Sequence, residues 1–477
     1  MTMPHVSQEL QRVFDQGWEA PALIDEAQEL TYGELYARAA AISNWMSQQG
    51  IGAGDVVALR LSNGWVLAAS YLACILGGQC FVPVNPELSE EDQAYILQRV
   101  SPRLVIEDET AIRALEFVTA TGPEFGEAAD TARAIFFTAG TTGRPKGVRH
   151  RLSGLMASAT AFNAAAGLDA TARMYHVLPM TYMAGFLNTL LCPWMAGGSV
   201  VLGPRFAPAN ALDFWSFPQS KGCNTIWITP TIAAVLARMT RDPAIAATVG
   251  ESFSRIFCGT APLTSHIRQS FLKKFGCPLQ ESYGMSEVLF VALQSREDAL
   301  VKTNAGSLLA GVELSFRPAA DQEEVEEMVV HAPWSLETYL LEDREETPLT
   351  AAGGMPSGDV AKIDEGCLWI TGRLKDLIIR GGVNVSPVAI EDVLSSDPDV
   401  ADVAVAGVED PVWGEAIGAY LVAAEGVDRD ALQTRLRSLC TEKLAASMRP
   451  DRYVWLDRLP RSSVGKVQKF LLKEAQA

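Results

Sequence analysis

The chain has 477 residues, enough for two or three domains around a large buried core. Its hydrophobic content of 48% and its charged content of 20% are ordinary for a globular enzyme. The formal net charge of −18 argues against nucleic acid or an anionic membrane as a partner, because both are themselves negatively charged.

The eight cysteines are scattered singly, without a CxxC pair, which favours reduced thiols in a cytoplasmic protein over a disulfide or zinc framework. The five histidines show no HxxxH or HExxH spacing. The N-terminus lacks a basic region followed by an apolar run, so we expect no signal peptide. The most apolar stretch, residues 65–84, is broken by Gly77, Gly78 and Pro83, which favours a buried helix and strand over a membrane span.

In chain order, strands and helices alternate through the first 110 residues. We expect strands over 22–24, 56–61, 80–84 and 104–106, and helices over 31–48, 63–76 and from Ser89 onward. Thr31 and Glu34 have the spacing of a capping box, and Leu35, Ile42 and Met46 share one face of the helix that follows. Strands that alternate with helices of this length predict parallel α/β layers.

The alternation continues beyond a buried strand over 134–137. We expect strands over 174–178, 199–202, 225–228, 254–258 and 278–280, with helices over 184–195, 230–239 and 263–275. From about Val312, short alternating runs between Gly, Pro and acidic turns predict an antiparallel β subdomain, in which the acidic run 321–327 is a solvated hairpin. The last hundred residues predict a small α+β domain, with helices over 387–394 and 428–444 and strands over 400–408, 418–424 and 453–456.

Residues 137–148, FTAGTTGRPKGV, combine the features that polyphosphate binding needs. Glycines let the backbone bend tightly and present its N–H groups, threonine hydroxyls add donors, and Lys146 supplies a positive charge. The segment is not a Walker A loop, because Pro145 stands where the second glycine of GxxxxGK[ST] belongs. From these residues alone, a phosphate cradle and an ordinary glycine-rich connection both remain open.

Four further segments carry short polar patterns: GTAPL at 259–263, ESYGMSE at 281–287, SGD at 357–359 with GRLKD at 372–376, and PRSSVGK at 460–466. Taken singly, each has an ordinary interpretation as a turn, a solvated carboxylate or a solvated lysine. No single one of them identifies a function.

Together and in this order, the five segments resemble the motifs of the adenylate-forming superfamily, which includes acyl- and aryl-CoA synthetases, luciferases and adenylation domains. The motifs run from residue 137 to 466, and residues 1–130 match in pattern more than in motif. The resemblance implies an α/β fold with a large multi-layer N-terminal domain, residues 1–374, and a small mobile α+β C-terminal domain, residues 375–477. It also implies ATP, Mg²⁺ and coenzyme A, with the hinge between the domains at Lys375.

The resemblance assigns a role to each motif residue. The phosphate contacts fall on Thr138, Gly140, Thr141, Thr142 and Lys146; the adenine side of the site falls on Thr260, Ala261, Pro262, Glu281, Ser282, Tyr283 and Gly284; and the ribose contacts fall on Asp359 and Arg373. Ser286 contacts the α-phosphate and Glu287 holds Mg²⁺, which prefers oxygen ligands. Lys466 bridges the substrate carboxylate and the α-phosphate, where a positive charge stabilises the developing negative charge. Gly381 and Gly382 lie on the segment that serves the thiol step.

The chain departs from the family at LPMTYMAG, residues 178–185, where Tyr182 replaces the usual histidine. Tyrosine fills a similar volume and donates a hydrogen bond, but it cannot be a cation near pH 7. His176 lies nearby in sequence and is a weak candidate for a replacement, because one face of a strand can carry it into the core.

By resemblance, the acid pocket is lined by mostly apolar residues: Tyr182, Met183, Phe186, Asn188, Trp227, Thr229, Thr260, Met285, Val288, Leu289 and Phe290. None of them is a carboxylate that would hold an α-ammonium group, which favours an acid with an apolar or aromatic body. For Met183, Phe186 and Phe290, a place in the plain hydrophobic core remains equally open.

The function that the resemblance implies is an ATP-dependent acid–CoA ligase, active on a small carboxylic acid as a monomer or homodimer in the cytoplasm. One alternative is a stand-alone adenylation enzyme that loads the phosphopantetheine thiol of a carrier protein. A non-catalytic sensor is disfavoured, because Glu287 and Lys466 are both present. The identity of the acid does not follow from the sequence.

Overall fold

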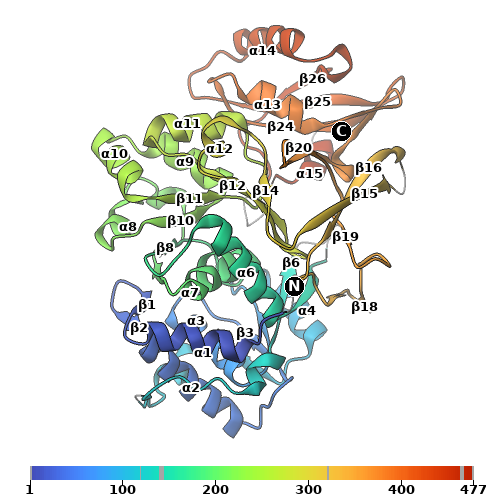
Figure 1. The fold of residues 1–477 in the computed structure, drawn as a ribbon. Coiled ribbons are helices and arrows are strands. Elements are labelled where there is room, and N and C mark those ends of the chain that lie inside the picture. The colour runs from blue at the N-terminus through green and yellow to red at the C-terminus, as the bar shows by residue number, and fades with distance from the viewer. Residues whose placement is uncertain (1–2, 119, 139–143, 320–321, 462–466, 475–477) are drawn as a thin grey trace.

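The computed structural model describes residues 3–118, 120–138, 144–319, 322–461 and 467–474. Two large sheets and their helices form the N-terminal part, and a smaller sheet with its own helices forms the C-terminal part, which lies over one side of it (Figure 1). The mixed α/β architecture predicted from the sequence is therefore confirmed.

The first large sheet has seven strands in the order β18-β17-β7-β6-β4-β3-β5. Its parallel half contains β3 (Val56–Leu59), β4 (Cys80–Pro83), β5 (Leu104–Ile106) and β6 (Arg133–Thr138). Its antiparallel half adds β7 (Lys146–Arg151), β17 (Thr338–Leu340) and β18 (Glu345–Glu346). In the hairpin of β6 and β7, Thr138 pairs with Lys146 at one end and Arg133 with Arg151 at the other.

Helices cover both faces of the seven-stranded sheet. On the inner side, α3 (Trp65–Leu76) is buried along nearly its whole length, as its uninterrupted apolar sequence requires. On the outer side, Ile96 and Val100 of α4 (Glu90–Val100) pack in one cluster with Val82 and Ile135. Next to α3 lies α2 (Tyr32–Gln48), which begins with the predicted capping box of Thr31 and Glu34.

The second large sheet has eleven strands in the order β2-β1-β9-β8-β10-β11-β12-β13-β14-β21-β20. Its first part, parallel from β1 to β12, contains β1 (Pro21–Ile24), β2 (Glu29–Thr31), β8 (Arg173–His176), β9 (Ser199–Leu202), β10 (Thr225–Ile228), β11 (Arg255–Cys258) and β12 (Gln280–Met285). The antiparallel part adds β13 (Leu289–Leu293), β14 (Gly306–Leu308), β20 (Asp359–Asp364) and β21 (Cys367–Arg373). The prediction of parallel layers followed by an antiparallel β subdomain is confirmed.

The remaining helices of the N-terminal part are α1 (Val6–Gly17), α5 (Glu109–Arg113), α6 (Leu152–Ala166), α7 (Cys192–Met195), α8 (Ser216–Ser220), α9 (Pro230–Met239), α10 (Pro243–Ser252), α11 (Ser265–Phe275) and α12 (Asp298–Val301). Residues 184–191, predicted as the first part of a helix, form a π-helix, η2 (Ala184–Leu191). The strand predicted over 278–280 begins at Gln280 instead and continues to Met285, so the ESYGM segment is itself a strand.

A three-stranded sheet of β15 (Glu313–Ala319), β16 (Gln322–His331) and β19 (Met355–Pro356) lies beside the second sheet. The prediction that residues 321–327 are a solvated hairpin is wrong at Glu327, which is buried. Its carboxylate pairs with Arg317 at 2.7 Å and accepts a hydrogen bond from the Gly358 N–H at 2.9 Å. These partners offset the cost of removing the charge from water.

The C-terminal part contains β22 (Ile378–Arg380), β23 (Val383–Val385), α13 (Pro387–Ser395), β24 (Val400–Asp410), β25 (Gly414–Ala423), α14 (Arg429–Lys443), β26 (Arg452–Trp455) and α15 (Lys469–Glu474). It has a hydrophobic core of its own, which includes Ile378, Ile390, Ile417 and Leu436. Its helix α13 contacts α11 of the N-terminal part, where Asp392 accepts a hydrogen bond from the Ser265 N–H at 3.2 Å. In the described part of the chain, no helix is long and apolar enough to cross a membrane.

Candidate active site

Lys146, Glu287 and Tyr339 form a compact cluster where the two large sheets meet, in which Glu287 and Tyr339 are buried and Lys146 is half-buried. The Lys146 Nζ atom is 2.8 Å from Glu287 Oε1 and donates to the Tyr339 hydroxyl at 2.9 Å, and that hydroxyl donates to the same carboxylate at 2.6 Å. The ammonium group also lies 4.0 Å from the centre of the Tyr339 ring. Side chains from two neighbouring strands, β7 and β17, thus contact a carboxylate in the turn between β12 and β13.

The cluster keeps Glu287 ionised. Burial on its own raises the pKa of Glu287, but the Lys146 charge and the hydrogen bonds from Lys146 and Tyr339 outweigh burial, so the pKa lies below its ordinary value. Burial and the adjacent Glu287 raise the pKa of Tyr339, which keeps its proton as a donor. A buried carboxylate next to a movable lysine is suited to hold a hard cation.

Hydrogen bonds to its backbone carbonyls hold the turn that carries Ser286 and Glu287. His150 Nε2 lies 2.7 Å from the Ser286 carbonyl oxygen, and the Leu336 N–H donates to the Glu287 carbonyl at 2.7 Å. Burial lowers the pKa of His150 to about 4, so its ring is neutral at pH 7 and donates from Nε2. Trp334 donates to the Val288 carbonyl at 2.8 Å and completes the support of the turn.

A second cluster consists of Tyr283, on β12, with Asp359 and Arg373. Asp359 is buried, accepts from the Tyr283 hydroxyl at 2.5 Å and accepts from Arg373 Nε at 2.8 Å. Asp359 and Arg373 face each other across β20 and β21, so the pairing of the strands brings them together. Burial, followed by the adjacent Asp359 charge, raises the pKa of Tyr283. The carboxylate retains free lone pairs, because each oxygen can accept two hydrogen bonds.

The GTAPL segment follows β11 and crosses the start of the ESYGMSE segment. A Cβ atom on Gly259 would lie 2.8 Å from the Ser282 carbonyl oxygen, so only glycine allows this approach. Thr260 has a φ of 73°, a left-handed conformation that is strained for a β-branched residue. Thr260 and Pro262 are exposed and Ala261 is half-buried, so the segment is accessible, and its contact with adenine stays a prediction.

Two other predicted nucleotide residues have partners within the protein. Glu281 pairs with Arg268 at 2.6 Å, and burial raises the pKa of Glu281 to about 7. The Ser282 hydroxyl donates to the Ala292 carbonyl of the neighbouring strand at 3.2 Å. Any nucleotide contact of these two side chains stays a prediction, whereas Gly284 is exposed at the end of β12.

The residues of the predicted acid pocket divide into two groups. Tyr182, Met183 and Met285 are half-buried, and Thr229 is the N-cap of α9. Deeper in the protein, Phe186 packs against Tyr71, Phe81 and Phe136, in the core position that the sequence left open. The fully buried members of the group are Asn188, Trp227, Val288, Leu289 and Phe290.

Trp227 belongs to an aromatic cluster directly beneath the GTAPL segment. Its ring lies 5.2 Å from the ring of Phe162 and 5.6 Å from that of Phe290, and Phe162 and Phe290 stack at 4.3 Å. A Cβ atom on Gly259 would lie 3.5 Å from Trp227 Cζ2. His176 is buried beside Thr189, with 2.7 Å between Nδ1 and Oγ1, and burial lowers its pKa to about 4.

The predicted hinge and thiol-side residues lie at the start of the C-terminal part. Lys375 is exposed in a short 3₁₀ turn (Leu374–Asp376) between β21 and β22. Gly381 and Gly382 form the exposed turn between β22 and β23, with φ values of 58° and 81°. The Gly381 N–H donates to the Trp413 carbonyl at 2.7 Å. Gly140, Thr141, Thr142 and Lys466 lie outside the described residues, while Thr138 pairs with Lys146 across the hairpin.

Sequence reasoning missed Tyr339 and His150, which contact the motif residues directly. Tyr339 lies in SLETYLLE, which carries no recognisable motif, and only the pairing of β17 with β7 brings it to Lys146. His150 follows the phosphate loop by a few residues, and the alternation of KGVRHR was the available signal that its side chain turns inward.

Comparisons with known proteins give matches over most of the chain. The family model of the AMP-binding enzymes matches residues 10–340, and the model of the C-terminal domain of AMP-binding enzymes matches residues 389–466. The sulfoacetate–CoA ligase of Cupriavidus necator is 30% identical, over 94% of this chain and 93% of its own. The 2-succinylbenzoate–CoA ligase of Bacillus subtilis is 28% identical, over 96% of both chains. The structure of the o-succinylbenzoate CoA synthetase of Bacillus subtilis with its acyl-adenylate intermediate superimposes with a TM-score of 0.81, at 27% identity over 99% of both chains.

Proposed function

Because the chain belongs to the family of AMP-binding enzymes, we propose that it is an ATP-dependent acid–CoA ligase acting on an apolar or aromatic carboxylic acid. The proposal rests on one observation: Glu287, which Lys146 and Tyr339 contact, lies a few residues along the chain from Tyr283, which donates to Asp359. One cluster has the charges that a triphosphate and a cation need, and the other has the acceptor that ribose hydroxyls need.

The residues present fit ATP and Mg²⁺. Glu287 is an ionised carboxylate paired with Lys146, and it would hold the cation when Lys146 contacts the phosphates instead. Among the described residues, no three His, Cys, Asp or Glu side chains are grouped around a possible metal position. Mg²⁺ needs no such group, since it is commonly held by one or two carboxylates together with phosphate oxygens and water. When bound, the ion neutralises charge on the phosphates.

In the proposed first step, an oxygen of the substrate carboxylate attacks the α-phosphorus of ATP. The bond from that phosphorus to the bridging oxygen breaks, and pyrophosphate leaves with the electron pair. Lys146 and Thr138 hold the β- and γ-phosphates, Ser286 contacts the α-phosphate, and Asp359 and Arg373 fix the ribose. Lys466, outside the described residues, is proposed to hold the attacking carboxylate in line with the leaving group.

In the proposed second step, the C-terminal domain (residues 375–477) turns about Lys375 against the N-terminal domain (residues 1–374). The turn of Gly381 and Gly382 then approaches the acyl group, where the thiol of coenzyme A attacks the carbonyl carbon. The bond to the phosphate oxygen breaks, AMP leaves, and the thiol proton passes to solvent. The separate core of the C-terminal part supports this division.

The choice of acid does not carry over from the relatives, because one is named for sulfoacetate and the other for 2-succinylbenzoate. The half-buried Tyr182 and Met183 and the aromatic cluster of Trp227 favour an apolar acyl body. We propose a monomer or homodimer in the cytoplasm, a location supported by eight cysteines that are all buried and unpaired.

The acceptor is tested by offering the enzyme ATP, Mg²⁺ and an acid together with either coenzyme A or a holo-carrier protein. We expect a thioester of coenzyme A and AMP. Acylation of the carrier protein without any acyl-CoA would instead identify a stand-alone adenylation enzyme.

A further inference from the structure

A cavity of about 280 Å³ opens on the outer face of the seven-stranded sheet. It lies toward the end of the β6–β7 hairpin where Arg133 pairs with Arg151, whereas the phosphate loop connects Thr138 and Lys146 at the other end. Because side chains alternate along strands, Arg133 and Arg149 face the cavity while His150 faces the core. The cavity is therefore separate from the candidate active site.

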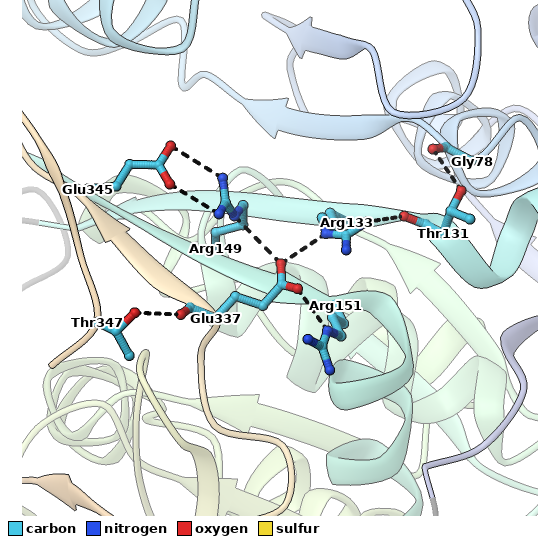
Figure 2. Close-up of polar contacts among 8 residues, drawn as sticks. All are labelled: Gly78, Thr131, Arg133, Arg149, Arg151, Glu337, Glu345 and Thr347. Atoms are coloured by element: carbon cyan, nitrogen blue, oxygen red, sulfur yellow. Dashed lines mark hydrogen bonds and ion pairs between the residues drawn. The ribbon is translucent and has the colours of Figure 1, made fainter. Parts of the chain in front are cut away.

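Positive charge exceeds negative charge around this cavity. Glu337 lies between three arginines (Figure 2): it accepts from Arg133 Nε at 2.9 Å and from Arg151 Nε at 2.7 Å, and lies 3.5 Å from Arg149 Nε. Glu345 pairs with Arg149 at 3.1 Å. Among the residues that line the cavity, the three arginines Arg99, Arg133 and Arg149 accompany one carboxylate, Glu345, an excess of two positive charges in a chain of net charge −18. The nearby Arg103 and Asp55 pair with each other at 3.4 Å and do not alter this balance.

The arginines are held in place with donors to spare. Arg133 Nη1 donates to the Thr131 carbonyl at 2.8 Å (Figure 2), and Arg99 donates to the carbonyls of Leu341 and Arg344. Within the described residues, Nη2 of Arg133 and Nη1 of Arg99 donate to no protein atom. Guanidinium groups fixed by the backbone lose little entropy when they bind an oxyanion.

The rest of the cavity is apolar. Val56, Cys80, Ile135 and Leu340 contribute to its lining, and Glu345 is the one carboxylate among its lining residues. The Glu345 side chain is 47% exposed, so it can leave Arg149 for water at little cost. The cavity thus combines a cationic rim, an apolar floor and a replaceable carboxylate.

We propose that this arginine pocket binds a small organic oxyanion, distinct from the substrates of the proposed ligase reaction. Its carboxylate or phosphate group takes the place of Glu345 against Arg149 and receives the spare donors of Arg99 and Arg133. Its apolar part lies on Ile135 and Leu340. Paired donors of this kind suit both planar carboxylates and tetrahedral phosphates.

Isothermal titration of the full-length protein tests the proposal with three probes: inorganic phosphate, hexanoate and hexyl phosphate. We expect hexyl phosphate or hexanoate to bind more tightly than inorganic phosphate, because only they use the apolar floor. The preferred organic probe identifies the head group. An absence of binding by all three at millimolar concentration, or equal binding of all three, would overturn the proposal.

Two variants locate the binding and keep the test independent of the active site. Glu345→Gln removes the competing carboxylate and should therefore tighten binding of the preferred organic probe. A misfolded variant would bind the probe more weakly, so an increase in affinity cannot result from misfolding. Arg149→Gln should weaken it about tenfold, as expected for a lost charge-assisted hydrogen bond. Glu346→Gln is the matched control, because Glu346 pairs with Arg344 and does not line the cavity. Binding that Glu345→Gln and Arg149→Gln leave unchanged would place the ligand elsewhere and refute the assignment.

Discussion

At the scale of single residues, the proposed reaction requires Glu287 to bind two different partners in turn. In the structure it is bound by Lys146 and Tyr339, and the proposed reaction requires it to hold Mg²⁺ instead. A lysine that neutralises a buried carboxylate before the cation arrives prevents the cost of an unpaired charge. The same lysine is then available for the phosphates.

Replacing Glu287 by Gln keeps the shape of the side chain but removes the charge that the cation needs. We expect acid-dependent ATP–pyrophosphate exchange to fall about 100-fold or more, as for loss of a group that stabilises transition-state charge. Tyr339→Phe removes one hydrogen bond to the same carboxylate and should cost about tenfold or less. Exchange by Glu287→Gln at close to the wild-type rate, with an unchanged circular dichroism spectrum, would remove Glu287 from the reaction.

Asp359→Asn tests the proposed ribose contact. The interaction is present in both the bound substrate and the transition state, so we expect KM for ATP to rise several-fold while kcat changes little. Asp364→Asn, at the exposed end of the same strand beside Lys362, is the matched control. An unchanged KM for ATP in Asp359→Asn would show that the Tyr283–Asp359–Arg373 cluster only supports the fold.

At the scale of elements, β10 and β13 bring Trp227 and Phe290 together and close the base of the proposed acid pocket. Trp227→Leu opens space beneath Gly259, so larger acids should gain in kcat/KM relative to the smallest acid that the wild type accepts. Trp215→Leu is the control: Trp215 is equally buried, in a separate cluster with Phe253 and Phe275. Both variants should lose about 2–4 kcal/mol of unfolding free energy. An identical acid preference in wild type and Trp227→Leu would exclude Trp227 as a limit on substrate size.

Local patterns predicted elements where the pattern had one interpretation. The capping box of Thr31 and Glu34 and the periodic face of α2 are such cases. The patterns failed for α6, which is rich in small and apolar residues on all sides and shows no amphipathic period. They also failed for β7, where arginines alternate with buried residues on a strand whose outer face is charged rather than apolar.

In the candidate site too, local sequence patterns predicted some residues and missed others. Motif order led to Glu287, Asp359 and Arg373, and the structure brings the last two together. Tyr339 lies 52 residues from Glu287 and 193 from Lys146, and no local pattern reports a contact made through strand pairing at that separation. No local pattern predicted that Arg268 pairs with Glu281 either, because Arg268 comes from the neighbouring helix α11.

At the scale of the whole molecule, two buried histidines link stability to pH. Burial lowers the pKa values of His150 and His176 to about 4, against about 6.5 in the unfolded chain. Between these values the unfolded chain binds protons that the folded chain does not, so their stabilising contribution is complete above pH 6.5 and is lost toward pH 4. At pH 5 each of the two histidines should lower the free energy of unfolding by up to about 2 kcal/mol relative to its value at neutral pH.

Urea unfolding at pH 7.5 and pH 5.0 measures this loss. Other groups also titrate in this range, so the comparison is between variants: His150→Gln and His176→Asn should each show a smaller loss than the wild type. His5→Gln, at an exposed position near the N-terminus, should show the same loss as the wild type. If the wild type and all three variants lose the same free energy of unfolding between pH 7.5 and pH 5.0, burial does not lower the pKa values of His150 and His176.

We propose that this one chain joins adenylation of an acid to thioester formation. The direct measurement is product stoichiometry across a panel of short, medium, aryl and hydroxy acids, with ATP, Mg²⁺ and coenzyme A. We predict that at least one apolar or aromatic acid yields one AMP and one pyrophosphate for each acyl-CoA formed, with no AMP when the acid is omitted. Release of ADP and phosphate, or no acid-dependent AMP with any member of the panel, would contradict the account.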